Sequence, residues 1–149
     1  MRRRLELLKG KRCWSIGAGE GTGNIFTLGF GAKRRREQPL TNRHLRQEER
    51  ECEAEYILMV ECSWRLEQRG KIVTTWQEPN GNEGPMVKGL ERLREKKVLF
   101  IKAWPPMNDL EIRFNDGYRL FIFCDLPARD GEGHNWCLET PKGPCVDSE

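Results

Sequence analysis

The chain has 149 residues, a formal net charge of +3 and a charged fraction of 33%. This length allows one domain of ordinary size, or two small halves that share a core. The small net charge does not by itself favour nucleic acid as a partner, and no apolar run approaches the roughly 18 residues of a membrane-spanning helix.

The N-terminal segment, MRRRLELLKGKRCW, opens with arginines but has no apolar stretch behind them. Glu6, Lys9 and Lys11 interrupt the region where a signal peptide has its apolar core, so we expect a cytoplasmic protein that does not enter a membrane. In that compartment the six cysteines are expected to be reduced. They contain no Cys-x-x-Cys pair, which argues against a zinc ribbon, and we expect no metal and no other cofactor.

The first half of the chain predicts a series of β-strands. Residues 5–9 have apolar residues at helical spacing, which predicts one helical turn or a loop that leads into the first strand. Residues 25–30, IFTLGF, alternate with period two, as a half-buried strand does. Residues 56–62, YILMVEC, and 63–67, SWRLE, predict two further strands.

The glycine-rich stretch GAGEGTG, residues 17–23, has spacings like those of a phosphate-binding loop. Such a loop opens a helix whose N-terminus faces the phosphate, whereas an alternating strand follows here. Glu20 adds negative charge in its middle, so we interpret the stretch as a flexible strand connection.

A charged insertion at about residues 32–55 separates the second strand from the third. It is basic at its start and acidic at its end, and it has few apolar residues. Two alternatives remain open: a mobile excursion, or a short helix from Asn42 as N-cap to about Glu53. A helix this polar has little surface to bury, so it would be marginal alone.

The second half predicts a similar series of strands behind a linker at about 68–89, which itself holds a strand candidate, KIVTTW. Residues 110–114, LEIRF, alternate, and YRLFIFC at 118–124 is apolar at nearly every position, so both of its faces are expected to be covered. Asn-Asp-Gly between these two segments predicts a tight hairpin. A fourth strand is predicted at 135–140, NWCLET.

The segments of the two halves match in the same order, from Leu5 with Leu90 to SWRLE with NWCLE. We therefore predict one domain, 1–149, with internal repeats at about 5–67 and 90–139. The fold class is mainly β: two repeated antiparallel β-meander halves packed as a pseudo-symmetric sandwich or barrel, with the charged insertion attached. The alternative is that any two alternating meanders align loosely.

The arginines of the insertion are the strongest electrostatic feature. They would contact phosphates or an acidic protein, or they form a solvated loop balanced by the glutamates nearby. Trp76 is either core or, if exposed, a partner-binding hot spot, and the loop LPARDGEGH offers a second contact surface. No catalytic or metal-ligating residue is predicted, and the candidate partner-binding residues are Arg34, Arg35, Arg36, Arg43, Arg46, Trp76, Asp130 and Glu132.

The stretch LEIRFNDGYRLFIF, followed by NWCLETPKG, resembles small uncharacterised bacterial β-rich proteins of immunity-protein type. In these, an L-x-L-x-F-x-D-G-x-x-L hairpin precedes an acidic loop and a W-x-L strand. The resemblance covers roughly residues 93–143 and, through the repeat, part of the first half. It implies a β-rich fold and, for some members, immunity against polymorphic toxins. It implies no catalytic residues, and the charged insertion departs from the pattern.

We expect a non-catalytic binding protein that recognises another protein, such as a toxin or a component of a bacterial phage-defence system. The first alternative is a nucleic-acid or nucleotide binder that uses the arginines of the insertion. The second alternative is an enzyme with a carboxylate-based site, which a deep pocket gathering Glu20, Asp125 and Glu139 would favour.

Overall fold

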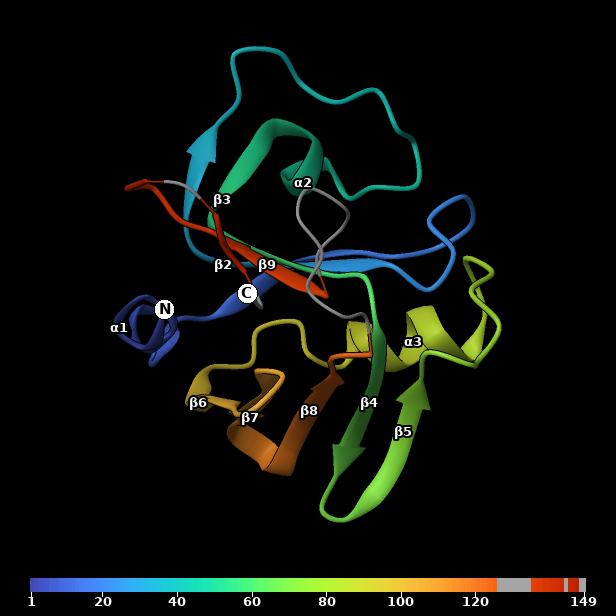
Figure 1. Cartoon of the computed structure of the whole chain (residues 1–149). Coiled ribbons are helices and arrows are strands. Elements are labelled where there is room, and N and C mark those ends of the chain that lie inside the picture. The colour runs from blue at the N-terminus through green and yellow to red at the C-terminus, as the bar shows by residue number, and fades with distance from the viewer. Residues whose placement is uncertain (126–134, 144, 148–149) are drawn as a thin grey trace.

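The computed structural model describes residues 1–125, 135–143 and 145–147, and these form two antiparallel β-sheets that share one apolar core (Figure 1). The expected mainly β fold is confirmed. The first sheet has the order β1-β2-β3-β9-β10 and the second has the order β5-β4-β8-β7-β6.

The strands of the first sheet are β1 (Cys13–Gly17), β2 (Phe26–Arg35), β3 (Cys52–Val60), β9 (Trp136–Glu139) and β10 (Val146–Asp147). Those of the second sheet are β4 (Ser63–Gln68), β5 (Lys71–Thr75), β6 (Val98–Trp104), β7 (Asp109–Phe114) and β8 (Tyr118–Phe123). The helical elements are α1 (Arg2–Leu5), α2 (Gln47–Glu51) and α3 (Pro85–Glu91), with two short 3-10 turns, η1 (Glu6–Leu8) and η2 (Asn115–Gly117).

The core lies between the inward faces of both sheets. Period-two alternation places Phe26, Leu28 and Phe30 of β2 inward, each at most 1% exposed. Aromatic rings from opposite sheets meet there, as Phe26 packs edge-to-face on Trp64 with ring centroids 4.8 Å apart. The same alternation in β8 leaves its outward side chains half-buried, so the expectation that both faces of this strand are covered is wrong.

Each sheet is completed by a strand from the other half of the sequence. β3 leaves the first sheet, turns at Glu61 and Cys62, and continues as β4 in the second sheet, where it pairs with β8 (Figure 1). In return β9, from the second half, pairs with β3 in the first sheet. The prediction of two separate four-stranded meanders is therefore wrong, because β4 and β9 each pair in the sheet that the other half of the chain mainly forms.

Several paired positions of the two sheets match. Each sheet has a register shift after the first paired residue of one edge strand, Cys13 on β1 or Val98 on β6. Each also inserts a tryptophan that donates its indole N–H to an asparagine carbonyl. The cross-strand pair Leu28–Leu58 of the first sheet matches Ile112–Leu120 of the second, and Leu58–Leu138 matches Leu120–Leu66. The Trp64 indole donates to the Asn24 carbonyl at 3.2 Å, and the Trp136 indole donates to the Asn108 carbonyl at 3.0 Å.

The two sheets also meet where β1 and β6 begin. Arg12 and Lys97 form an isolated antiparallel bridge. On either side of it the Cys13 amide donates to the Lys96 carbonyl at 2.8 Å, and the Val98 amide donates to the Lys11 carbonyl at 3.0 Å. The backbone groups at these strand ends are thereby paired between the sheets rather than left to water.

The two flanks of the insertion extend the β2–β3 hairpin, and a loop and α2 lie between them. The ladder continues to Arg35 opposite Cys52, and the Arg36 amide then donates to the Glu51 carbonyl at 2.8 Å. The helix expected from Asn42 to Glu53 is reduced to the five residues of α2. The Oδ1 atom of Asn42 accepts from the amide of His44 at 3.0 Å instead of capping a helix.

Helix α3 spans the end of the predicted linker and the start of the predicted second repeat. Pro85 occupies its first turn, a position that lacks an intrahelical N–H partner in any case. Gly89 contacts the side chain of Thr74 on β5 so closely that a Cβ at this position would collide with it. The missing side chain lets the helix approach the sheet, and Met86 and Leu90 are fully buried there.

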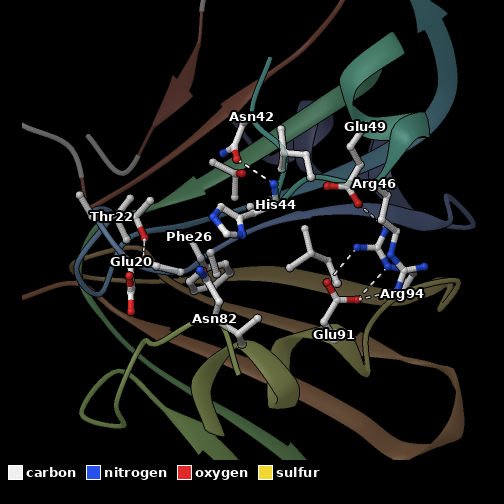
Figure 2. Close-up of a pocket in the computed structure, with 18 of the residues that line it drawn as sticks. Glu20, Thr22, Phe26, Asn42, His44, Arg46, Glu49, Asn82, Glu91 and Arg94 are labelled. Atoms are coloured by element: carbon white, nitrogen blue, oxygen red, sulfur yellow. Dashed lines mark hydrogen bonds and ion pairs between the residues drawn. The ribbon is translucent and has the colours of Figure 1, made fainter. Parts of the chain in front are cut away.

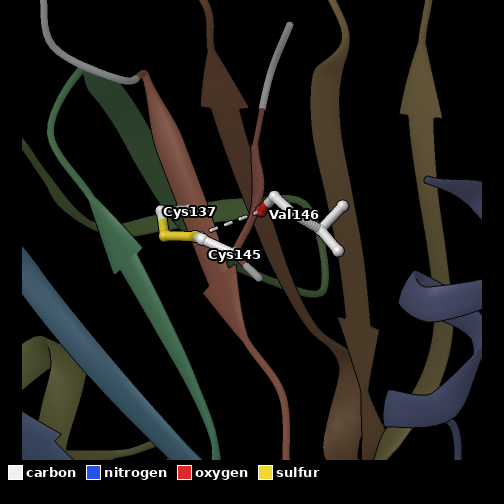
Figure 3. The surroundings of a disulfide bond; sticks show 3 residues. All are labelled: Cys137, Cys145 and Val146. Atoms are coloured by element: carbon white, nitrogen blue, oxygen red, sulfur yellow. Dashed lines mark hydrogen bonds between the residues drawn. A yellow bond between two sulfur atoms is a disulfide. The ribbon is translucent and has the colours of Figure 1, made fainter. Parts of the chain in front are cut away.

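The structure joins Cys137 of β9 to Cys145 by a disulfide, with Cα atoms 6.0 Å apart (Figure 3). The expectation that all six cysteines are reduced is wrong for this pair, whereas Cys13, Cys52, Cys62 and Cys124 are free thiols. In the described part of the chain, no helix combines the length and the apolar character that crossing a bilayer requires.

The exchange of strands predicts that the halves depend on each other. Backbone cleavage between Gly81 and Asn82, in the loop before α3, should leave one piece whose sheet lacks β9 and β10 and another whose sheet lacks β4 and β5. We expect neither piece alone to unfold cooperatively, because β3 or β8 would then present an unpaired edge. An equimolar mixture should regain the cooperative thermal transition in circular dichroism, and a cooperative transition in either isolated piece would contradict this.

Candidate functional site

The residues predicted to bind a partner do not form one patch. Arg34 and Arg35 are exposed at the far end of the β2–β3 hairpin, and Arg36 is half-buried beside them. Arg43 is exposed in the loop that precedes α2, whereas Arg46 reaches Glu91 with an N–O distance of 3.4 Å. Asp130 and Glu132 lie outside the described residues. Trp76 is half-buried and packs against the core, which does not fit an exposed hot spot.

A cavity of about 550 Å³ lies between the edge strand β1, the insertion and the end of α3 (Figure 2). Figure 2 shows the His44 side chain at its centre, with Asn82 on one side and Arg94 on the other. The volume falls in the range of small-molecule sites, so the cavity is large enough to hold a small ligand.

Charged groups along one wall of this cavity neutralise one another. Arg94 donates from Nε and Nη2 to both carboxylate oxygens of Glu91, each at 2.9 Å, and its Nη1 lies 2.6 Å from Glu49 Oε1. Nη1 also donates to the carbonyl of Trp14. A guanidinium held by two carboxylates and a carbonyl is not available to bind an anion, so this cluster anchors α2 to the chain after α3.

The pKa values of this cluster show that the burial is costly. Burial raises the pKa of Glu49, which is 4% exposed, and the attraction of Arg94 does not fully offset it. Burial acts in the lowering direction on the pKa of Arg94, but the hydrogen bonds to Glu91 and the charge of Glu49 raise it overall. The ion pair therefore specifies where α2 sits more than it stabilises the fold.

The cavity does not assemble the groups expected for catalysis. Glu20 lines the cavity, but Asp125 and Glu139 do not. The three carboxylates predicted for an enzymatic site are therefore not brought together. Within the described residues, the imidazole of His44 has no carboxylate hydrogen-bonded to it, and no cluster of three or more potential metal ligands occurs.

A second feature, which was not predicted from the sequence, covers the outward side of the second sheet. Cationic and aromatic side chains alternate there on β6, β7, β8 and β4. We call this surface the arginine–aromatic face and define it by Arg65, Phe100, Lys102, Trp104, Glu111, Arg113, Arg119, Phe121 and Phe123.

Glu111 is the electrostatic centre of the arginine–aromatic face. Its carboxylate is 1% exposed and accepts from Arg113 Nε at 2.8 Å, Arg119 Nε at 2.7 Å and Trp104 Nε1 at 3.0 Å. Burial acts to raise the pKa of Glu111, but these three hydrogen bonds and the charge of Arg119 outweigh it and hold the pKa below its usual value. One buried anion thus fixes three outward-facing side chains.

The guanidinium groups are held over aromatic rings as well. Arg113 lies 4.7 Å from the ring centroid of Phe100, and Arg119 lies 4.2 Å from that of Phe121. Arg65 lies 5.3 Å from the rings of both Phe121 and Phe123. Because stacking and hydrogen bonding restrain each side chain, the face is pre-organised before any partner binds.

The fold does not impose this composition, because the matching face of the first sheet lacks it. The register places Ser15 opposite Gly29, as it places Phe100 opposite Arg113. The positions that match Lys102, Glu111, Arg119 and Phe121 hold Gly17, Thr27, Ile57 and Met59, although Glu55 and Glu139 add charge elsewhere on that face. The charges and rings are thus a property of one face. The sequence contained a signal for this face, because charged residues stand at alternating positions in LEIRF and at the second position of YRLFIF. The otherwise apolar composition of YRLFIF obscured this signal.

Removing the charge of Glu111 should weaken the fold. We expect Glu111→Gln to lower the free energy of unfolding by ~3 kcal/mol at pH 7, because two arginines lose a buried carboxylate partner. Urea titrations of both proteins at several pH values would measure this.

The same substitution should also flatten the response to acid. The folded pKa of Glu111 lies below the unfolded one of about 4.3, so its stabilisation is present above that value. It is lost as the pH falls through the folded pKa. The wild-type and variant stabilities should therefore converge as the pH falls below about 4.3, and a difference that stays constant throughout the acid range would contradict the assignment.

The two ends of the buried ion pair should respond unequally. Arg94→Gln should destabilise the protein by about 3 kcal/mol, since it leaves Glu49 buried without a cation. Glu49→Gln should cost clearly less, because burial already disfavours its charge while Arg94 keeps Glu91. Equal losses in urea unfolding would contradict this account.

Comparison of the chain with protein-family models, with curated protein sequences and with solved structures found no match. The function is therefore argued from the geometry of the cavity and of the arginine–aromatic face. The face has exposed guanidinium groups that are held in position and still have donors for a partner, whereas the charges along one wall of the cavity are paired with each other.

Proposed function

We propose that this protein is a non-catalytic binding protein that recognises another protein through the arginine–aromatic face. A bacterial toxin, or a component of a phage-defence system, is the kind of partner that an immunity or inhibitor protein neutralises. The observation that carries the proposal is the set of rings and guanidinium groups oriented around the buried carboxylate of Glu111.

The composition of the face supports a protein partner. Arginine, tryptophan and phenylalanine are enriched at protein interfaces, and truncation of arginine or tryptophan there often costs the most binding energy. Trp104 is 42% exposed although its indole N–H is held by Glu111, so its ring is presented in a fixed position. A sheet supplies a rigid base for such a surface, and an inhibitor needs no reactive group.

Nucleic acid remains the alternative partner. The exposed Arg34 and Arg35 support it, because guanidinium groups contact phosphates. The arginine–aromatic face supports it less, since the rings of Phe100, Phe121 and Phe123 already carry guanidinium groups and are less available for bases to stack on. Affinity that falls steeply and log-linearly with salt would favour this alternative.

We also propose that the two halves descend from one duplicated module whose fourth strand was exchanged. The coincident registers support this, as does the indole-to-asparagine hydrogen bond that occurs in both sheets. A duplication frees one copy to change while the other preserves the scaffold. The arginine–aromatic face then represents the copy whose outer surface acquired a binding function.

The proposed function is tested by capture from the native host. We expect Trp104→Ala to fold normally and to weaken binding of the captured protein by roughly 30-fold, the effect of losing one interface hot spot. Titration calorimetry with the purified partner would measure this. A captured protein that binds both forms equally would remove the face from the proposal.

A matched variant tests the other candidate surface. Replacing Arg34, Arg35 and Arg36 together by Glu reverses exposed or half-exposed charges on the hairpin and should leave folding intact. Weaker partner binding by this triple variant would add the insertion to the interface. Unchanged affinity would leave the arginine–aromatic face as the contact surface.

A further inference from the structure

An open groove of about 600 Å³ lies at one end of the arginine–aromatic face. Residues of β6, β7, η2 and β8 line it. Its polar wall is formed by Arg113 and Arg119, and its apolar wall by Leu99 and Phe100.

The charges of this groove do not balance. Arg113 and Arg119 share the single carboxylate of Glu111, so one positive charge is left without a counterion. Asp116 also lines the groove, but Lys96 pairs with it and cancels its charge. An anionic group entering the groove would therefore meet an uncompensated guanidinium.

The Nη donors of that guanidinium are not used in hydrogen bonds within the described part of the chain. Arg113 donates to Glu111 through Nε at 2.8 Å, and no hydrogen bond from its two Nη atoms occurs there. Stacking on Phe100 holds the guanidinium plane in place. A fixed pair of Nη donors matches the two oxygens of a carboxylate, which arginine binds in a bidentate manner.

An exposed apolar side chain lies beside these donors. Leu99 is 60% exposed on the edge strand β6, next to the half-buried ring of Phe100. Apolar area left open beside an oriented cation suits a ligand that combines an apolar group with an anion.

We propose that this groove binds an extended polypeptide segment in which an acidic side chain adjoins an aliphatic one. The carboxylate pairs with the Nη atoms of Arg113, and the aliphatic group covers Leu99. This inference rests on the proposed function and names the chemistry of the partner. Charge complementarity is its basis, because the groove has an unmatched cation and no unmatched anion among the described residues.

The probe is a six-residue peptide of alternating leucine and glutamate with blocked ends, which excludes a terminal carboxylate as the ligand. It is titrated into the full-length protein, and the indole ¹H–¹⁵N NMR signal of Trp104 is followed, with Trp104→Phe used to assign it. The matched peptide has glutamine in place of glutamate. Separate titrations with inorganic phosphate and with a thymidine oligonucleotide distinguish the other anionic ligands.

We expect the glutamate peptide to shift this signal saturably and the glutamine peptide to bind at least roughly tenfold more weakly. Arg113→Gln should weaken the glutamate peptide about tenfold as well. It leaves Glu111 paired with Arg119 and Trp104, so folding is retained. Leu99→Asn, an exposed site, should weaken both peptides several-fold, and Arg34→Gln should change neither.

Equal binding of the two peptides would overturn the proposal, and so would tighter binding of phosphate or of the oligonucleotide. Loss of peptide binding in Arg34→Gln would also overturn it. The proposed function fails separately, when the captured partner is insensitive to Trp104→Ala. If that partner depends on Trp104 but the glutamate peptide does not bind, the face is the interface and the acidic partner class is wrong.

Discussion

The structure depends on the exchange of the fourth strand between the two halves. A lone meander of three strands has an uncovered apolar face and two edges without a strand partner, and such a unit is marginally stable in water. Here β9 closes the first sheet and β4 closes the second, and each carries a fully buried tryptophan into the shared core. The corners between the sheets, the bridge at Arg12 and Lys97, and the position of α3 all follow from this arrangement.

The rigid scaffold explains how one face can hold so many charges. Burying a carboxylate such as Glu111 costs free energy unless donors surround it. β6, β7 and β8 supply those donors at fixed separations, since neighbouring strands lie about 4.8 Å apart. The guanidinium groups are thereby aligned over rings of the same sheet, and their remaining donors face solvent. The fixed positions of the strands thus also fix the positions of the side chains on the outer face.

The sequence predicted the local elements better than their partners. Alternation identified β7 and β8, and the Asn-Asp-Gly turn between them is present, with Asp116 and Gly117 at positive φ. Strand exchange was not predictable, because the same alternation allows SWRLE to pair within its own half or with the other. The cavity depends on Glu49 meeting Arg94, residues distant in sequence. The arginine–aromatic face was missed because YRLFIF has the composition of a buried strand.

The long separation in sequence between β3 and β9 bears on the order of synthesis. β3 leaves the ribosome long before the strand that covers its edge, so the first sheet stays incomplete until β9 has emerged. Contacts this far apart in sequence slow folding, since the chain must close a long loop before they form.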